Sequence, residues 1–582
     1  MRFLRMLTNS LLAGALGAAY LTIVVLQLNP HVPLLSMTTA RLYGVLVLFY
    51  GVHLAAIFYL LMVGRELVSL NALSPGWVSV RVLAWLAAAS ALVASALMWL
   101  NLDGFTFALD DTALRRMSAG AAATTATAIV LLGLAAAHFS FGRRGSRVGA
   151  ALLTIAIFGS IALPVAARGP GVTPWPDLPA PVAVVTTPAA VSTPRVVMIL
   201  LDGASLEYIW PRAAAGRLPN FARLLENGAA MDLATVRPTG PEPVWAAAAT
   251  GMYPAKNGVR GSAVYYARGD DRPLLLLPDH CFSHVLVHLG LLRSDANSSA
   301  SLRARPLWSI LAHAGVSVGI VRWPLTYPTQ PVNGFLLSDR FHELLGSLLE
   351  LDDRAAFPAD AISVARQAFT EQDEQADPVP AADVSGERAK TPEASAHRRD
   401  RLYSRAMGDL GERWAVQVTA LRYQGLDTVG HYNLRYTQPR EFGDLSDDDR
   451  RRGLQAIDRY YAYIDGEVGQ AVARLAPGDL LLVISGFGMQ PPSTLKYLLG
   501  RVIGDPMSGT HERAPDGFLL AYGDVVQRGR RQRGAIVDVT PTVLYFLGLP
   551  VGRDMDGYAR ADLFRPEFAA GRPVAFIPSH NR

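Results

Sequence analysis

Asp427, His431 and His511 are side chains of the types that bind divalent metal ions, and the first two have a spacing that suits one shared ion. Asp427 and His431 lie four positions apart in the stretch GLDTVGH at 425–431. At a loop–helix junction, that spacing lets both side chains converge on the same ion. His511 ends the stretch SGTH at 508–511. Imidazole and carboxylate groups are the ligands that catalytic zinc sites commonly use.

Asp202, Asp427 and Ser485 each lie just past a short apolar run. Such runs alternate with amphipathic helical stretches, which predicts an α/β fold with a largely parallel sheet and helices on both faces. Open α/β sheets place their sites at the carboxyl ends of the strands, so these three side chains are expected near one another. The predicted strands are 196–201, 316–321, 415–423, 480–485 and 517–522, and the predicted helices are 218–227, 307–313 and 464–475.

The order and spacing of four segments resemble the alkaline phosphatase superfamily, and within it the type I phosphodiesterase/nucleotide pyrophosphatase branch. The resemblance covers residues 195 to about 564. It implies two divalent cations about 4 Å apart, which activate a hydroxyl nucleophile and hold the phosphate. The segments are LDG at 201–203, GLDTVGH at 425–431, SGTH at 508–511 and DVTPT at 538–542.

By this resemblance, Asp427, His431 and His511 are the ligands of one divalent metal, zinc or manganese. The second metal would be bound by Asp202 and by the Asp and His of a Ser-Asp-His-Gly motif. That motif is replaced here by SGFGM, so Gly486 offers only backbone and Phe487 only an apolar ring. We therefore expect one bound ion rather than two.

Two interpretations of Asp202 follow from this loss. It is either a metal ligand without its usual partners, or a strand-end carboxylate bonded to backbone amides.

The expected nucleophile is displaced as well. The stretch RPTGPEPVW at 237–245 resembles the nucleophile loop of the family and the helix after it, but the position of the attacking hydroxyl falls on Pro241. Thr239 lies two residues earlier, in a loop that its prolines allow to bulge. Thr239 is therefore the candidate nucleophile, and Glu242 is a candidate further ligand. The alternative is a rigid turn in which Thr239 caps the helix.

Aromatic and histidine clusters supply further candidates. Trp323 and Tyr327 lie in a segment that resembles the phosphodiesterase branch, and they could stack on a base or an acyl group; aromatic residues near prolines are also common in cores. His280, His284 and His288 recur every four residues. On a helix they would form one face, either half-buried or binding a soft or borderline metal.

Five apolar runs before residue 168 are long enough to cross a bilayer. With 582 residues and a mean hydropathy of +0.22, the chain should form at least two units, one of them in lipid. Arginines predominate on one side of the runs, which predicts a cytoplasmic N-terminus and, after five spans, an extracytoplasmic, periplasmic remainder. A re-entrant segment at 119–137 would invert this topology. The runs are 9–27, 43–62, 80–100, 119–137 and 148–167; the two sets of arginines are Arg2, Arg5, Arg65, Arg81, Arg143, Arg144 and Arg147 against Arg41, Arg115 and Arg116.

The predicted organisation is a transmembrane bundle at 1–167, a Pro-rich extended linker at 168–194, and an alkaline-phosphatase-like domain at 195–582. Residues 371–400 are polar and aperiodic, which predicts a surface insertion or a mobile loop. The single cysteine, Cys281, excludes an internal disulfide. The net charge of +5 comes from residues spread along the chain, so no nucleic-acid partner is expected.

The predicted function is that of an inner-membrane protein whose external domain hydrolyses or transfers a phosphoester with a divalent metal. Its anchored layout resembles that of bacterial phosphoethanolamine and glycerophosphate transferases, which implies a small phosphoester or a lipid head group as substrate. The alternative is a catalytically inactive binding or sensing module of the cell envelope. That alternative is favoured by the joint loss of functional side chains at Pro241, Gly486 and Phe487.

Overall fold

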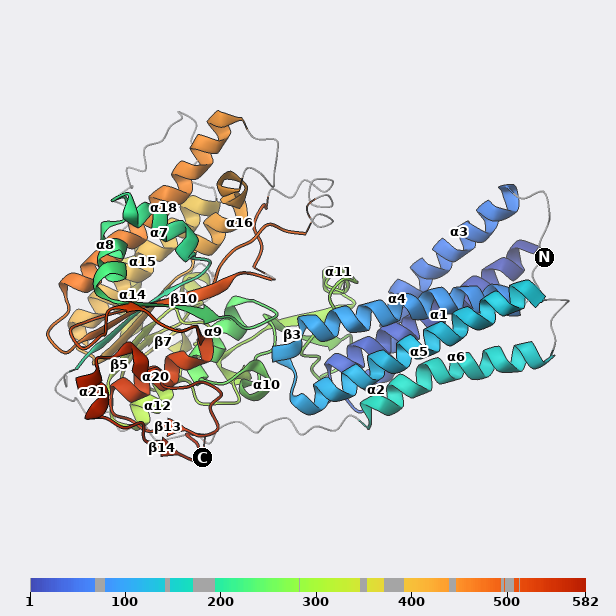
Figure 1. Ribbon diagram of the computed structural model, residues 1–582, viewed down its shortest axis with the longest axis horizontal. Coiled ribbons are helices and arrows are strands. Elements are labelled where there is room, and N and C mark those ends of the chain that lie inside the picture. Colours follow the sequence, from blue (N-terminus) through green and yellow to red (C-terminus); the bar gives the residue numbers. More distant parts are fainter. Residues whose placement is uncertain are drawn as a thin grey trace. The chain divides into compact units, whose positions relative to one another are not determined.

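The chain forms two compact units, each described here by itself (Figure 1). One contains Met1–Pro176 together with Ala263–Ala296, and the other contains Asp177–Ser262 and Asn297–Arg582. The computed structural model describes residues 2–68, 79–141, 147–170, 194–281, 283–345, 353–370, 392–438, 446–493, 497, 507–511 and 513–581.

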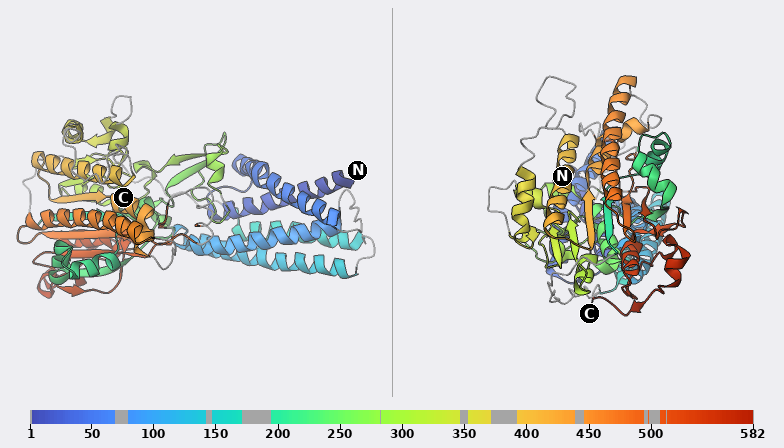
Figure 2. Two further views of the ribbon diagram at one scale, coloured as in Figure 1. Left: turned by 90° about the horizontal axis from the view of Figure 1, so that it is seen from above. Right: turned by 90° about the vertical axis from the view of Figure 1, so that its left-hand side faces the viewer.

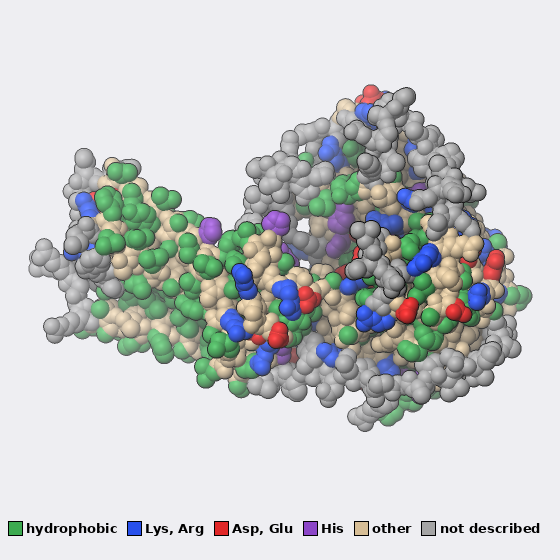
Figure 3. Space-filling view, turned by 180° about the vertical axis from the view of Figure 1, so that it is seen from behind, with side chains coloured by type: hydrophobic (Ala, Val, Ile, Leu, Met, Phe, Trp, Pro, Cys, Tyr) green, Lys and Arg blue, Asp and Glu red, His purple; other side chains and the backbone are tan. Residues whose placement is uncertain are grey.

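The first unit is built on long apolar helices that run side by side (Figure 2). Five helical spans are long and apolar enough to cross a membrane, which confirms the five predicted runs by length and composition. Hydrophobic side chains cover much of the visible face of these helices (Figure 3), as a lipid-facing surface requires. The helices are α1 (Arg2–Leu28), α2 (Met37–Leu46), which continues through a π-helical turn into α3 (Val52–Val68), α4 (Val80–Gly104), α5 (Asp111–Phe141) and α6 (Arg147–Arg168).

A hairpin from the middle of the chain belongs to this helical unit. Strands β3 (Ala263–Ala267) and β4 (Leu292–Ala296) pair antiparallel, and the segment between them contacts the end of α1. The buried side chain of Asn29 accepts hydrogen bonds from the backbone N–H of Leu275 at 2.7 Å and of Leu276 at 3.2 Å, and donates one to the Leu276 carbonyl at 2.9 Å. The predicted domain at 195–582 is thus interrupted by a segment that packs on the helices.

The predicted helical face of three histidines is wrong. Helix α11 spans only Val285–His288, and His280 precedes it with a left-handed φ of 65°. Because a residue in that conformation cannot continue a right-handed helix, His280 does not share a helix face with His284 and His288.

The second unit is an α/β domain around a 10-stranded, mostly parallel sheet, which confirms the predicted fold class. The sheet order is β11-β2-β10-β9-β1-β8-β5-β6-β7, with β12 beside β2. Strands β9, β1, β8, β5 and β6 are parallel, and β10, β2 and β7 introduce antiparallel pairs. The bounds are β1 (Val196–Leu201), β2 (Ala229–Ala234), β5 (Val318–Val321), β6 (Gly334–Leu337), β7 (Ala356–Phe357), β8 (Val418–Tyr423), β9 (Leu480–Phe487), β10 (Asp516–Tyr522), β11 (Gly529–Arg530) and β12 (Gly534–Ala535).

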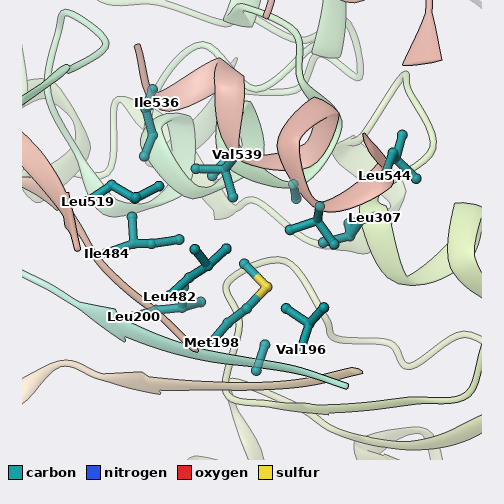
Figure 4. Close-up of a cluster of buried hydrophobic side chains, with 14 of the residues drawn as sticks. Val196, Met198, Leu200, Leu307, Leu482, Ile484, Leu519, Ile536, Val539 and Leu544 are labelled. Carbon is teal, nitrogen blue, oxygen red and sulfur yellow. The ribbon is translucent and has the colours of Figure 1, made fainter. Parts of the chain in front are cut away.

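Helices cover both faces of this sheet because its central strands are apolar on both sides. Alternate residues of β1 enter two different cores. Val196, Met198 and Leu200 face the core formed with α9 (Pro241–Thr250), α12 (Leu307–His313) and α20 (Val539–Phe546) (Figure 4). The opposite core includes α7 (Leu206–Ala214), α8 (Pro219–Asn227), α14 (Ala361–Thr370), α15 (Pro392–Arg413), α16 (Gly425–Thr437) and α18 (Asp447–Ala473).

The predicted polar insertion at 371–400 is only partly within the described residues. Residues 371–391 lie outside them. Residues 392–400 are the beginning of helix α15, and Ala396 and Asp400 in this part are buried. The prediction of a surface insertion is therefore wrong for 392–400, because Asp400 has a partner in the core that its local sequence does not indicate.

A buried ion pair holds the beginning of α16, the helix that carries two of the candidate metal ligands. Arg322 follows β5 and pairs with Asp400 of α15; the side chains are 2% and 0% exposed. Asp400 also accepts hydrogen bonds from the N–H of Gly425 at 3.0 Å and from the Tyr460 hydroxyl. The carboxylate thereby satisfies one of the free N–H groups at the helix start and interacts favourably with the helix dipole.

We expect Arg322→Met to lower the free energy of unfolding by about 3–5 kcal/mol, because it leaves Asp400 buried without its cation. Arg530→Gln is the control: it removes an ion pair to Asp232 whose side chains are 66% and 40% exposed, and it should cost at most about 1 kcal/mol. Urea unfolding of the detergent-solubilised full chain, followed by Trp fluorescence, measures both. Equal effects of the two substitutions would contradict this role of Arg322.

Candidate metal centre

Asp427, His431 and His511 come together in the folded chain. Each offers one ligand atom, and these three atoms lie within 4.8 Å of one another. Asp427 and His431 are on the first turns of α16, four residues apart on one face, and His431 Nε2 lies 3.5 Å from Asp427 Oδ2. His511 arrives from a separate segment, with its ring centroid 5.3 Å from that of His431.

Hydrogen bonds to backbone carbonyls orient both imidazoles. His431 Nδ1 is 2.7 Å from the carbonyl oxygen of Gly509, and His511 Nδ1 is 3.0 Å from that of Thr239. Because a carbonyl oxygen only accepts, each Nδ1 carries the hydrogen and each Nε2 keeps its lone pair. Metal-binding histidines are held in this way in most proteins.

The segment 507–511 is fixed to α16 by a reciprocal set of bonds. The carbonyl of His431 accepts from the N–H of Ser508 at 2.7 Å and of Gly509 at 2.9 Å, while Gly509 accepts from the His431 ring. A β-carbon on Gly509 would lie 2.5 Å from the carbonyl oxygen of Gly430, so only glycine permits this approach. The motif SGTH therefore positions His511 through contacts with the helix that carries the other two side chains.

The three side chains fit a divalent cation. Asp427 is 7% exposed, and its Oδ1 is buried without a hydrogen-bond partner among the described residues. An unpaired buried carboxylate oxygen is costly, and a cation between the three groups would compensate for it. Two nitrogens and one carboxylate oxygen suit zinc, and also manganese.

Asp202, the candidate ligand of a second ion, is paired with other side chains. It is fully buried; its Oδ2 accepts from Nε of Arg422 at 3.0 Å and from Nη2 of the same residue, and its Oδ1 accepts from the indole N–H of Trp245 at 2.6 Å. Its partners are therefore a guanidinium and an indole rather than backbone amides, and the prediction of amide partners is wrong. Burial raises the pKa of Asp202, while Arg422 and Trp245 act to lower it.

Arg422 supplies the positive charge at this position. Burial by itself would lower the pKa of Arg422, but the adjacent Asp202 carboxylate, together with Glu242 and Asp339, raises the pKa above its usual value. The guanidinium therefore remains charged beside Asp202.

Apolar groups fill the two positions that lack metal ligands. A β-carbon at Gly486 would lie 2.5 Å from Cγ1 of Val244, so an aspartate would not fit there unless Val244 moved. Phe487 is fully buried and packs against His511, with ring centroids 5.3 Å apart. Phe487 thus supports one face of a candidate ligand of the first ion.

Thr239 lies beside the three candidate ligands through its backbone. Its carbonyl accepts from His511, while its hydroxyl donates to the carbonyl of Val236 at 2.9 Å and is largely buried. Helix α9 begins with Gly240 as its N-cap and has no side-chain cap, so the alternative of a capping hydroxyl is wrong.

Glu242 lies in the first turn of α9, next to the loop that carries Thr239. Its Oε2 is buried without a partner among the described residues. Burial raises the pKa of this carboxyl group. Glu242 is therefore a buried carboxyl group with an unpaired oxygen close to the loop.

The structure separates the two aromatic candidates. Trp323 is fully buried, donates its indole N–H to the carbonyl of Trp245 at 3.1 Å, and packs edge-on against Trp245 and Trp308. It is part of the core, so the prediction that it stacks on a substrate is wrong. Tyr327 is half-buried, with the guanidinium of Arg340 at 5.8 Å from its ring centroid, and its substrate contact stays a prediction.

Sequence reasoning missed Arg422 and Trp245. Arg422 lies inside the predicted strand at 415–423, and a lone charge in a buried strand is the signal that would have indicated an ion pair. Nothing local to Trp245 indicates that its N–H is directed at Asp202.

Comparisons with known proteins identify a family for this chain. A family model described as "Type I phosphodiesterase / nucleotide pyrophosphatase" matches residues 196–506. No curated protein matches the chain. Among solved structures, the chain is similar to murine ectonucleotide pyrophosphatase/phosphodiesterase 5, described as inactive and in complex with AMP. The sequence identity is 13% and the TM-score is 0.38, and the match covers 64% of this chain and 100% of that chain.

The family model matches more than half of the chain, so the chain belongs to the type I phosphodiesterase/nucleotide pyrophosphatase family.

Proposed function

We propose that this protein is a membrane-anchored, metal-dependent phosphodiesterase or phosphotransferase that works with one divalent cation. The observation that carries the proposal is the convergence of Asp427, His431 and His511, with both Nδ1 atoms anchored and Asp427 Oδ1 unpaired. Family membership supports a hydrolase of phosphoesters. The substrate class is a small-molecule phosphoester or the head group of a lipid.

The residues divide into two roles. Asp427, His431 and His511 hold the cation, which when bound supplies charge stabilisation at a phosphoryl oxygen. Thr239 is the candidate nucleophile: its hydroxyl oxygen attacks phosphorus and its proton passes to water, so that a new P–O bond forms. The P–O bond to the leaving group breaks, and the departing alkoxide takes up a proton from water to leave as an alcohol. The bond from His511 to the Thr239 carbonyl holds this loop beside the cation site, and attack requires the hydroxyl to give up its hydrogen bond to the Val236 carbonyl.

Arg422 explains how the site can work without a second ion. In a two-metal site, Asp202 would be neutralised by a cation. Here the guanidinium of Arg422 neutralises it, so Asp202 is compensated without a second ion. This arrangement supports one ion per chain.

The proposed location is the cytoplasmic membrane, with the α/β domain on the periplasmic side. Five apolar helices support anchoring, and the distribution of arginines supports this orientation.

A second candidate function is that of a catalytically inactive binding or sensing module. The observation that favours it is the packing of the second site: Arg422 holds Asp202, Val244 fills the space beside Gly486, and Phe487 packs on His511. Such a module would bind a phosphate-containing ligand without turnover.

Metal analysis tests the cation site. After removal of metal and reconstitution with zinc or manganese, the full chain should hold about one ion, and the metal should raise its stability by about 3 kcal/mol at a hundredfold excess over Kd. Asp427→Asn and His511→Ala should abolish both the ion and the stabilisation.

Asp202→Asn is the matched control. It should lower the Tm because Arg422 loses its partner, yet it should keep one ion and the same metal-dependent increase in Tm. The one-ion proposal would be refuted if the wild type held two ions or no ion. It would also be refuted if Asp202→Asn lost the ion.

Turnover separates enzyme from binding module. With bis(4-nitrophenyl) phosphate as substrate, Thr239→Ala should reduce kcat at least about a thousandfold with metal content unchanged, because only the attacking hydroxyl is lost. Thr239→Ser should retain most of the rate. Equal rates in Thr239→Ala and wild type would exclude this nucleophile, and absence of turnover in metal-loaded wild type would favour the binding module.

Labelling tests the orientation. In a Cys281→Ser background, Tyr558→Cys introduces a thiol at a position where the native side chain is 77% exposed, and a membrane-impermeant maleimide should label it in cells with a permeabilised outer membrane. Leu67 is the last residue of the span Met37–Leu67, at the end that the proposed orientation places in the cytoplasm. Leu67→Cys should therefore react only after the inner membrane is disrupted. The reverse pattern would place the α/β domain in the cytoplasm.

A further inference from the structure

An apolar groove lies between helices α1, α2 and α6 of the helical unit. Its volume is about 610 Å³, within the range of about 300–1,000 Å³ that small-ligand sites occupy. Mostly aliphatic side chains line it, including Leu35 just before α2 and Met37 at the start of α2, which are 96% and 66% exposed. Other lining residues include Ile23, Leu26, Leu34, Ala40, Ile161 and Val165.

Two arginines lie next to residues that line this groove. Ile161, Val165 and Arg168 are four and three residues apart on α6, so they share one face of the helix, and Ile161 and Val165 line the groove. Arg168 reaches the carbonyl of Leu26, another lining residue, at 2.7 Å. The guanidinium of Arg116 on α5 is adjacent, 3.8 Å from where a β-carbon on Gly169 would lie.

Arg168 has donor capacity that the protein does not use. Its Nε and Nη2 donate to carbonyls at the end of α1, including that of Asn29 at 3.0 Å. Its Nη1 has no partner among the described residues, although the residue is only 2% exposed. An unsatisfied buried guanidinium N–H is costly, so a structural role at the end of α1 does not account for this nitrogen.

Neither arginine has a counter-ion in the described part of the chain. No carboxylate oxygen there lies within ion-pair distance of Arg116 or Arg168. Two neighbouring positive charges repel each other unless an anion lies between them. The end of the groove is therefore complementary to an anion attached to an apolar chain.

We propose that this groove binds one anionic glycerophospholipid of the surrounding membrane. An acyl chain lies along Ile23, Ile161 and Val165, and the phosphate accepts hydrogen bonds from Arg116 and from Nη1 of Arg168. Basic pockets at the ends of transmembrane helices bind phospholipid head groups by this chemistry. With a cytoplasmic N-terminus, the arginines face the extracytoplasmic leaflet. The site is separate from Asp427, His431 and His511 and does not depend on turnover there.

The test is lipid binding to the delipidated full chain at a fixed detergent concentration, measured by native mass spectrometry. The probe is dihexanoylphosphatidylglycerol. Glycerol 1-phosphate has the phosphate without the chains, and dihexanoylglycerol has the chains without the phosphate. Only the complete phospholipid should bind with 1:1 stoichiometry, since the groove and the arginines each supply part of the affinity.

Variants assign the binding to this place. Arg116→Gln, at an exposed position, should weaken binding of the phospholipid about tenfold by removing one charge-assisted contact. Arg115→Gln, the exposed neighbour on the same helix, should leave it unchanged. Ala40→Trp should block the groove and reduce binding by a similar factor. Hydrolysis of bis(4-nitrophenyl) phosphate should be the same in Arg116→Gln as in wild type.

Three results would overturn the proposal. Equal binding by the Arg116→Gln and Arg115→Gln variants would show that the arginine pair is not the phosphate site. If dihexanoylglycerol bound as tightly as dihexanoylphosphatidylglycerol, the groove would not recognise the head group. Binding of glycerol 1-phosphate as tight as that of the phospholipid would mean an anion site independent of the groove. Failure of the Thr239 or metal experiments leaves each of these results unaffected, because they use different residues and a different readout.

Discussion

The carboxylate of Asp202 is buried at the end of the central strand, and the structure around it depends on how that charge is neutralised. Removing a carboxylate from water costs several kcal/mol unless a cation and hydrogen bonds compensate for it. Arg422 on the neighbouring strand and Trp245 on α9 provide this compensation. Because β1 and β8 are parallel and in register, Arg422 lies next to Leu200 and reaches Asp202 directly.

The pairing of Asp202 with Arg422 affects the rest of the site. A guanidinium is larger than a metal ion and brings its own hydrogen-bond donors, so it does not need the two further ligands that a second cation would require. The positions of those ligands are instead packed: Val244 fills the space beside Gly486, and Phe487 supports His511. Restoring an aspartate and a histidine there would have to displace both groups. These two positions are thus filled by packed side chains.

A neighbouring ion pair supports the candidate metal ligands in a similar way. Arg322 and Asp400 lie in the core and fix the N-terminus of α16, while the His431 carbonyl fixes the segment that delivers His511. Each candidate ligand is therefore held by elements that come from distant parts of the chain. Rigid support of this kind is what positions metal ligands accurately enough to bind an ion.

Local patterns in the sequence were sufficient to predict the apolar helices, the principal strands, and the pairing of Asp427 with His431, because hydrophobic periodicity and a four-residue spacing are properties of neighbouring residues. The partner of Asp202 was not predictable in this way, since Arg422 is 220 positions away and only the order of strands in the sheet brings the two together. The same holds for Trp323, whose surroundings form a core rather than a ligand site, and for residues 263–296, which pack on helices far earlier in the chain. Tertiary structure decided these points because burial and ion pairing depend on which distant segments meet, and no local pattern records that.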